Sequence, residues 1–222
     1  MFESQKHAFW EALLATIFIF GIGILFGVIL ENWRTSAIND LYERSEVELL
    51  DIKIQNEIYS RGNFDCVIAA ESNLELADKI YEEAKLLEKY ETARRLTESL
   101  IVQHKKYDLL REMLFLNSIK IKEKCKLPYD TLVYFYIPDY EEPSLDIISK
   151  QKVFSKLLGE LKQKKGNSIL LIPIGVNKDV SSINLVLKTY NISRKDLPII
   201  LINEKTKITD VQNSEQIGQY LK

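Results

Sequence analysis

Residues 12–30, ALLATIFIFGIGILFGVIL, decide how this chain is organised, because no side chain in the run carries a charge. Glu11 and Glu31 bracket the run, and Trp10 and Trp33 lie just outside its two ends. A helix needs roughly 20 apolar residues to cross the hydrocarbon core of a bilayer, and tryptophan rings favour the headgroup level. The sequence therefore predicts a transmembrane helix over about residues 12–30.

A cleaved signal peptide is the alternative interpretation of this run. Its apolar core usually spans about 7–15 residues and precedes a small-x-small cleavage site. The run here is longer, and residues 29–33 offer no such site. We therefore expect residues 1–33 to form a retained anchor in a lipid bilayer.

The orientation of the anchor is weakly encoded. Lys6 precedes the span, and Arg34 and Arg44 follow it, so positive charge barely discriminates between the two sides. A short tail before a large domain usually stays inside. We expect a single-pass protein of the cell membrane, with a cytoplasmic N-terminus and an extracytoplasmic soluble part.

Gly23 and Gly27 form a small-xxx-small pair within the span. This spacing lets two helices approach closely in lipid and would support a homodimer. Glycine is also frequent in membrane helices for other reasons, and we favour that interpretation slightly.

The composition of the 222 residues argues against several classes of function. A net charge of −2 and a pI near 5.9 argue against nucleic acid, which selects strongly basic surfaces. The two Cys and two His are scattered, so they cannot make a zinc site of the usual spacing. No Gly-rich phosphate loop or dinucleotide fingerprint occurs. We expect neither a metal nor a cofactor.

Residues 34–126 lack proline and contain one glycine, Gly62, a composition typical of long helices. Apolar spacing predicts helices over about residues 35–59, 64–90 and 97–124, with Thr97 as a cap of the third. We interpret the segment as a stalk in which a helical hairpin packs on the helix that leaves the membrane. We assign His104 and the many Glu and Lys side chains to solvated faces.

Cys66 lies at the start of the second predicted helix and Cys125 at the end of the third, so both lie at the open end of this predicted hairpin. Residues equidistant from the turn of an antiparallel hairpin meet side by side, so the pair could reach disulfide geometry. A disulfide persists only in an oxidising compartment, which favours an exported soluble part. Two unrelated buried cysteines are the alternative.

Residues 127–222 differ in composition, because short β-rich runs alternate with helical patterns. The order is strand, helix, strand, helix, strand, strand, helix. Strands separated by helices imply a parallel pair, and the closing strands add antiparallel neighbours. The predicted fold class is α+β: a transmembrane helix, a helical stalk, and an α/β domain with a four-stranded mixed sheet and helices on both faces.

This C-terminal part resembles the thioredoxin fold. Residues 133–136, VYFY, resemble the first central strand of that family, which leads into its active-site turn. Leu197-Pro198 at the head of a strand resembles the segment that carries the family's cis-proline, and residues 203–206 resemble its terminal hairpin. The resemblance implies a peptide-binding groove, which Tyr136, Tyr140, Leu197 and Pro198 would line.

The sequence departs from the family at the redox turn. Aligning the proline of the Cys-x-x-Cys motif puts Glu141 and Ser144 at the cysteine positions, and an ungapped alignment puts Tyr140 and Pro143 there. Disulfide exchange requires a thiolate, so neither alignment supports thioredoxin-type activity. We expect Glu141 and Glu142 to serve the dipole of the following helix rather than to form a carboxylate dyad.

These observations favour a membrane protein that presents a redox-inactive thioredoxin-like domain as a binding or assembly module for a protein partner. One alternative is a membrane-tethered thiol oxidoreductase that uses Cys66 and Cys125. Lys124 and Lys126 flank Cys125 and would lower the pKa of its thiol. Another is a dimeric structural spacer built on Gly23 and Gly27.

Overall fold

The computed structural model describes residues 2–91, 98–210 and 213–221. The chain divides into two compact units, Met1–Arg44 and Ser45–Lys222, and each is described by itself.

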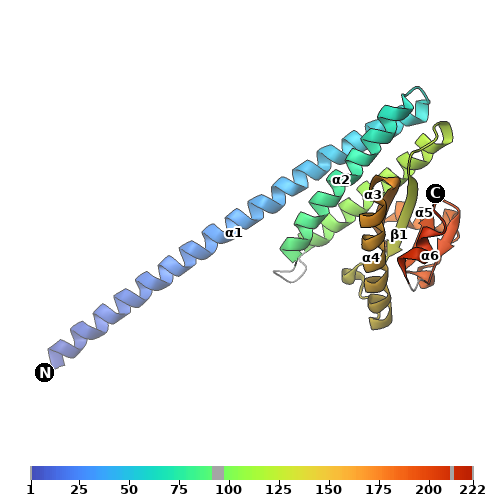
Figure 1. Ribbon diagram of the computed structural model, residues 1–222. Coiled ribbons are helices and arrows are strands. Elements are labelled where there is room, and N and C mark those ends of the chain that lie inside the picture. The colour runs from blue at the N-terminus through green and yellow to red at the C-terminus, as the bar shows by residue number, and fades with distance from the viewer. Residues whose placement is uncertain (1, 92–97, 211–212, 222) are drawn as a thin grey trace. The chain divides into compact units, whose positions relative to one another are not determined.

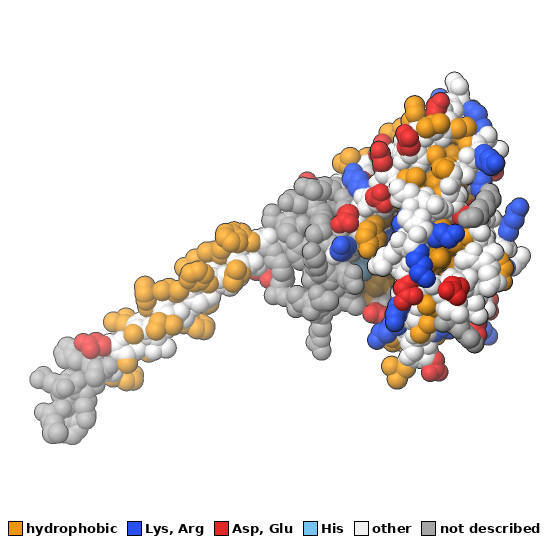
Figure 2. All heavy atoms as spheres, viewed as in Figure 1, with side chains coloured by type: hydrophobic (Ala, Val, Ile, Leu, Met, Phe, Trp, Pro, Cys, Tyr) orange, Lys and Arg blue, Asp and Glu red, His pale blue; other side chains and the backbone are white. Residues whose placement is uncertain are grey.

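The first unit consists of the N-terminal part of helix α1 (Phe2–Arg61). Within the described residues, Phe9–Trp33 is the one helical segment long and apolar enough to cross a membrane, with a mean hydropathy of 2.8. Hydrophobic side chains cover the surface of this segment (Figure 2). The predicted apolar helix near the N-terminus is therefore confirmed.

Three helical segments open the second unit. Helix α1 ends at Arg61, and Gly62 follows with φ +70°, a left-handed conformation that glycine adopts without a Cβ penalty. Helix α2 (Cys66–Glu91) and helix α3 (Glu98–Lys124) pack side by side (Figure 1). The cap predicted at Thr97 lies outside the described residues.

An apolar seam of α3 is buried. Its members are at most 4% exposed: Leu100, Tyr107, Leu110, Leu114 and Ile121. On α1, Ile52 and Tyr59 of one apolar stripe are buried, while Leu50, Ile54 and Ile58 of a second stripe are exposed.

The remaining chain forms a four-stranded mixed sheet of order β2-β1-β3-β4. Its strands are β1 (Asp130–Tyr136), β2 (Ile169–Gly175), β3 (Ile199–Ile202) and β4 (Thr206–Ile208). Strands β1 and β2 are parallel, whereas β3 runs antiparallel to both β1 and β4. This arrangement confirms the predicted mixed sheet.

Helices α4 (Leu145–Lys165), α5 (Ser181–Thr189) and α6 (Ser214–Gly218) connect or follow the strands. Short 3-10 turns add η1 (Asp139–Glu141), η2 (Gly166–Ser168) and η3 (Arg194–Asp196).

Alternation along the strands separates two apolar layers, because successive side chains point to opposite faces of a sheet. Leu132, Tyr134 and Ile200 face α4 and α6, where they form a core with Phe154 and Ile217. Strand side chains on the other face form the larger core together with residues of α2, α3 and α5. These strand residues are Val133, Phe135, Leu170, Ile172, Ile174, Ile199 and Leu201.

A buried polar cluster also joins α2 and α3 to the start of the sheet. The Asn73 amide of α2 donates hydrogen bonds to Ser118 Oγ of α3 at 2.7 Å and to Tyr129 Oη at 3.0 Å. Asn73 and Ser118 are 0% exposed. Helices α2 and α3 are therefore part of the same folded unit as the sheet.

Candidate functional site

The carboxyl ends of the parallel strands β1 and β2 carry the residues that the sequence analysis selected. In α/β sheets this edge is where ligand sites usually form. Tyr136 ends β1, and the turn 138–144 follows it. Because Phe135 pairs with Ile199, Pro198 at the head of β3 lies beside the same end of β1. The structure thus brings Tyr136 and Pro198 to one edge.

The side chains predicted to line a groove at this edge are buried or partly buried. Leu197 is 3% exposed and Pro198 is buried, while Tyr136 and Tyr140 are partly buried. The Leu197–Pro198 peptide bond is cis. Binding of an extended segment against these residues stays a prediction, and it requires their present cover to move.

The turn after β1 is held by its own carboxylate. Glu141 accepts from the Arg194 guanidinium at 2.9 Å and from the Lys178 backbone N–H at 3.3 Å. Its side chain is 10% exposed, and the Lys178 ammonium lies 3.4 Å away. Glu141 therefore ties the turn to the segments after β2 and before β3.

Ser144 caps helix α4, because its hydroxyl accepts from the Ile147 N–H at 3.4 Å. Glu141 lies in η1, before the helix begins, and Glu142 has φ +52°. Asp146 is the acidic residue in the first turn of α4. Glu141 thus works through ion pairs with Arg194 and Lys178, not through the helix dipole.

Helix α3 supplies a buried carboxylate to the same edge. Asp108 Oδ1 accepts from the Gly175 backbone N–H at 2.8 Å and from Arg111 Nη1 at 3.3 Å. Asp108 is 2% exposed. Burial raises the pKa of Asp108 to about 6, although Arg111 and the Gly175 N–H act in the opposite direction.

Two further contacts continue along this side of α3. Lys105 pairs with Asp179 at 3.2 Å, and the Ser182 hydroxyl donates to Glu112 at 2.6 Å. Burial raises the pKa of Glu112, which the Ser182 hydrogen bond opposes. Lys105, Asp108 and Glu112 therefore hold α3 against the last residue of β2 and the residues that follow it.

Aromatic and imidazole groups complete the cluster. The rings of His104 and Tyr140 lie 5.8 Å apart. Burial lowers the pKa of His104 to about 4, and the positive charge of Arg111 adds to this effect. Burial also raises the pKa of Tyr140 to about 12 and that of Tyr136 above its ordinary value. At neutral pH the two phenols and the imidazole are uncharged.

The sequence did not single out Asp108, and Glu112 was among the glutamates expected on solvated faces. The available signal was their spacing, because Asp108, Glu112 and the fully buried Phe115 stand at i, i+4 and i+7 and so share one side of the helix. Arg111 and Arg194 were also missed, and no local pattern singles them out. These residues bind the fold's own backbone and side chains, which is a structural role.

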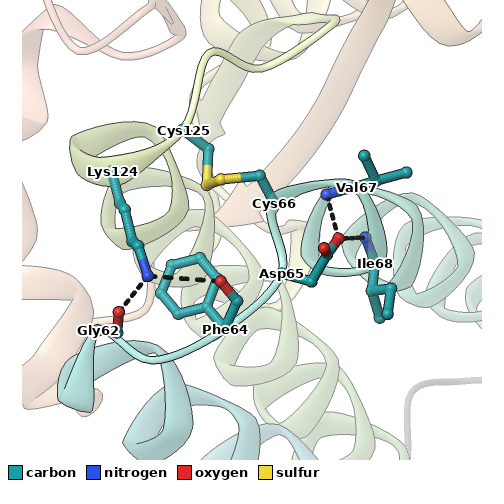
Figure 3. Close-up of a disulfide and its surroundings, with 8 residues drawn as sticks. All are labelled: Gly62, Phe64, Asp65, Cys66, Val67, Ile68, Lys124 and Cys125. Carbon is teal, nitrogen blue, oxygen red and sulfur yellow. Dashed lines mark hydrogen bonds between the residues drawn. A yellow bond between two sulfur atoms is a disulfide. The ribbon is translucent and has the colours of Figure 1, made fainter.

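The two cysteines lie at a different place in the fold. Cys66 at the start of α2 and Cys125 just after α3 are at disulfide-bonding distance, with sulfur atoms 1.98 Å and Cα atoms 5.6 Å apart (Figure 3). The pairing predicted from the spacing of the helices is confirmed. Cys125 is 6% exposed, which leaves little access for a thiol substrate.

Hydrogen bonds fix both sides of this cysteine pair (Figure 3). Asp65 Oδ1 accepts from the N–H groups of Val67 at 2.8 Å and Ile68 at 3.0 Å and so caps α2. The Lys124 ammonium donates to the carbonyls of Gly62 and Phe64 and lies 4.6 Å from the Phe64 ring centroid. The pair therefore closes a rigid end of the helical segment.

The glycine pair predicted for helix packing in lipid has no neighbour among the described residues of one copy of the chain. No atom outside the local helix lies within 4 Å of where a Cβ would stand on Gly23 or Gly27. Across the described residues, no group of His, Cys, Asp and Glu has the geometry to hold a metal ion.

No protein-family model, curated protein or solved structure matches this chain.

Proposed function

We propose that this chain is a single-pass membrane protein whose soluble part is a redox-inactive, thioredoxin-like binding or assembly module. The observation that carries the proposal is the sheet order β2-β1-β3-β4, with Pro198 beside the end of β1 and no thiol in the turn that follows this strand. Helices α4 and α6 on one face and α5 on the other agree with the helices that the sequence predicts on both faces of the sheet.

The anchor and the compartment belong to the proposal. The apolar segment Phe9–Trp33 would hold the chain in the bilayer. A Cys66–Cys125 disulfide persists in an oxidising compartment, which favours an extracytoplasmic soluble part and a cytoplasmic N-terminus.

Trapping of free thiols in cells tests the compartment. Cells are lysed directly into a maleimide mass tag, and gel mobility is compared with and without prior reduction. We expect no labelling of Cys66 or Cys125 until a strong reductant is added. Labelling of both cysteines without reductant would place the soluble part in a reducing compartment.

The oxidoreductase alternative makes a different prediction for the same pair. A catalytic dithiol cycles and has a potential close to that of its compartment, whereas a structural disulfide resists reduction by the glutathione pool. Equilibration of the purified chain with glutathione buffers separates the two. Reduction of the pair at cellular glutathione ratios would favour the enzyme.

Site-specific photo-crosslinking in cells tests the binding module. A crosslinker at exposed Glu142, in the turn after β1, is compared with one at exposed Lys164, near the other end of α4. We expect a discrete protein adduct from position 142 and none from position 164. Equal adducts from both positions, or none from either, would count against a partner at this edge.

A further inference from the structure

The soluble unit exposes a second apolar face on helix α1. Val47, Leu50, Ile54 and Ile58 are 67%, 58%, 60% and 46% exposed. Their spacing of three, four and four residues aligns them along one side of a helix with about 3.6 residues per turn. We call these four residues the outer stripe.

The opposite side of the same segment already packs within the chain. Ile52 is 0% exposed, and Glu48 pairs with Lys79 of α2 at 2.6 Å. The Asn56 amide donates to Asn117 of α3 at 2.8 Å. A helix that is apolar on both sides is typically buried on both sides, so the outer stripe lacks its cover within one copy.

An open groove extends this apolar surface. It has a volume of about 250 Å³, and its lining includes Ile58 of the outer stripe together with Phe64 and Ile68. Ile68 is itself 64% exposed. Contiguous exposed apolar surface of this kind marks a site of association.

We propose that the outer stripe is the interface between two copies of this chain, packed with their α1 helices parallel. The charges beside the stripe specify the partner. By helix geometry, Asp51 lies on one flank of the stripe and Lys53 on the other. In a parallel two-fold pair the flank with Asp51 meets the partner's flank with Lys53, and this contact occurs twice.

In the antiparallel alternative each flank meets its own equivalent, so Asp51 and Lys53 do not face each other. Two glutamates also lie on the Lys53 flank, and each is paired with a cation of its own copy. Glu46 pairs with Lys106, and Glu57 pairs with Arg61. The proposal depends on residues of the soluble unit and is independent of the membrane anchor and of the edge near Pro198.

The mass of the full chain in detergent micelles tests the interface. We expect the wild type to be a dimer and Ile54→Glu to be a monomer at the same concentration. Leu185→Glu is the matched control, because Leu185 is 65% exposed on α5, and it should remain a dimer. Near-ultraviolet circular dichroism and mobility without reductant establish that both variants fold.

A charge exchange tests the parallel arrangement. Asp51→Lys and Lys53→Asp should each weaken the dimer about tenfold, since each reverses two exposed pairs. The double variant D51K/K53D should restore wild-type affinity, because opposite charges face each other again. A double variant no tighter than the single variants would overturn the parallel arrangement.

A monomeric wild type would overturn the interface itself. So would an unrelated protein that crosslinks to Ile54 while the chain stays monomeric. Because these measurements need no membrane insertion and no contact near Pro198, they can fail while the proposed function stands, and the reverse also holds.

Discussion

The Asp108 carboxylate of helix α3 accepts a hydrogen bond from the Gly175 backbone N–H at 2.8 Å, across 67 residues of sequence. This contact joins a helix that the sequence places in a stalk to the last residue of strand β2. Asp108 thereby fixes α3 against the last residue of β2, which pairs with Tyr136 at the end of β1.

Gly175→Ala should destabilise the soluble unit. A Cβ at this position would stand 2.5 Å from Asp108 Oδ2 and 2.8 Å from Pro138 Cγ, so α3 or the turn would have to shift. Overpacking of this kind costs about 1–3 kcal/mol of unfolding free energy. Denaturant titration of the full chain in detergent, followed by circular dichroism, measures the change.

Gly159→Ala is the control for that measurement. Gly159 lies within α4, and nothing is within 4 Å of its added Cβ. The higher helix propensity of alanine should stabilise the chain by up to about 1 kcal/mol. Equal loss of stability in both variants would contradict the close contact at Gly175.

Asp108 should also give the chain a specific pH dependence. Its folded-state pKa of about 6 lies above the ordinary value of 3.8, so the folded chain holds this proton more tightly than the unfolded chain does. Its contribution is fully present below pH 4 and is lost as the pH rises through 6. The loss is on the order of 3 kcal/mol, because one unit of pKa corresponds to about 1.4 kcal/mol.

Asp108→Asn removes this titration and isolates it. Between pH 4 and pH 7 the stability of this variant should rise relative to that of the wild type. Gly159→Ala changes no titratable group, so its difference from the wild type should stay constant over the same range. A constant difference for Asp108→Asn as well would contradict the raised pKa of Asp108.

Several features could be predicted from the sequence because they depend on local pattern. The uncharged run 12–30 predicted an apolar helix, and Gly62 predicted the end of α1, where φ is +70°. The near-symmetric positions of Cys66 and Cys125 in the two helices predicted their approach to 5.6 Å between Cα atoms. The alternation of strands and helices after residue 127 predicted the mixed sheet.

The contacts at the edge of the sheet could not be predicted in the same way. Asp108 and Glu112 find their partners 67 and 70 residues away, and helix periodicity carries no information about such distant groups. Glutamate and lysine side chains on a helix are solvated in most proteins, which led to the wrong assignment of Glu112. The exposure of Ile54 was likewise unpredictable, because the spacing of an exposed apolar stripe is the same as that of a stripe that packs within the chain.

Glu141→Gln should weaken the turn after β1. The substitution removes the charge that faces Arg194 at 2.9 Å and Lys178 at 3.4 Å. We expect a loss of about 1–2 kcal/mol, since hydrogen bonds between charged groups exceed neutral ones but these two cations are partly solvated. Glu142→Gln, at the exposed neighbouring position, should change stability by less than about 0.5 kcal/mol.

Hydrogen exchange of the residues that flank the turn separates a local effect from a global one. Loss of the Glu141 ion pairs should speed amide exchange in segments 139–142 and 176–180 more than in α4. Uniform acceleration across the sheet would mean that Glu141 contributes to the whole fold rather than to the turn.

Replacement of both cysteines by serine should lower stability without changing the sheet. A bond between Cys66 and Cys125 closes a loop across 59 residues of sequence, and disulfides that close loops of this size contribute about 2–4 kcal/mol by restricting the unfolded chain. The side chains of Asp65 and Lys124 would still hold the ends of α2 and α3 through hydrogen bonds to backbone groups. Folding should therefore survive the substitution.

Denaturant titration of the wild type with and without reductant, beside C66S/C125S, gives the measurement. Reduced wild type and the double variant should unfold at the same midpoint, and equal stability of all three would mean that no bond constrains the unfolded chain.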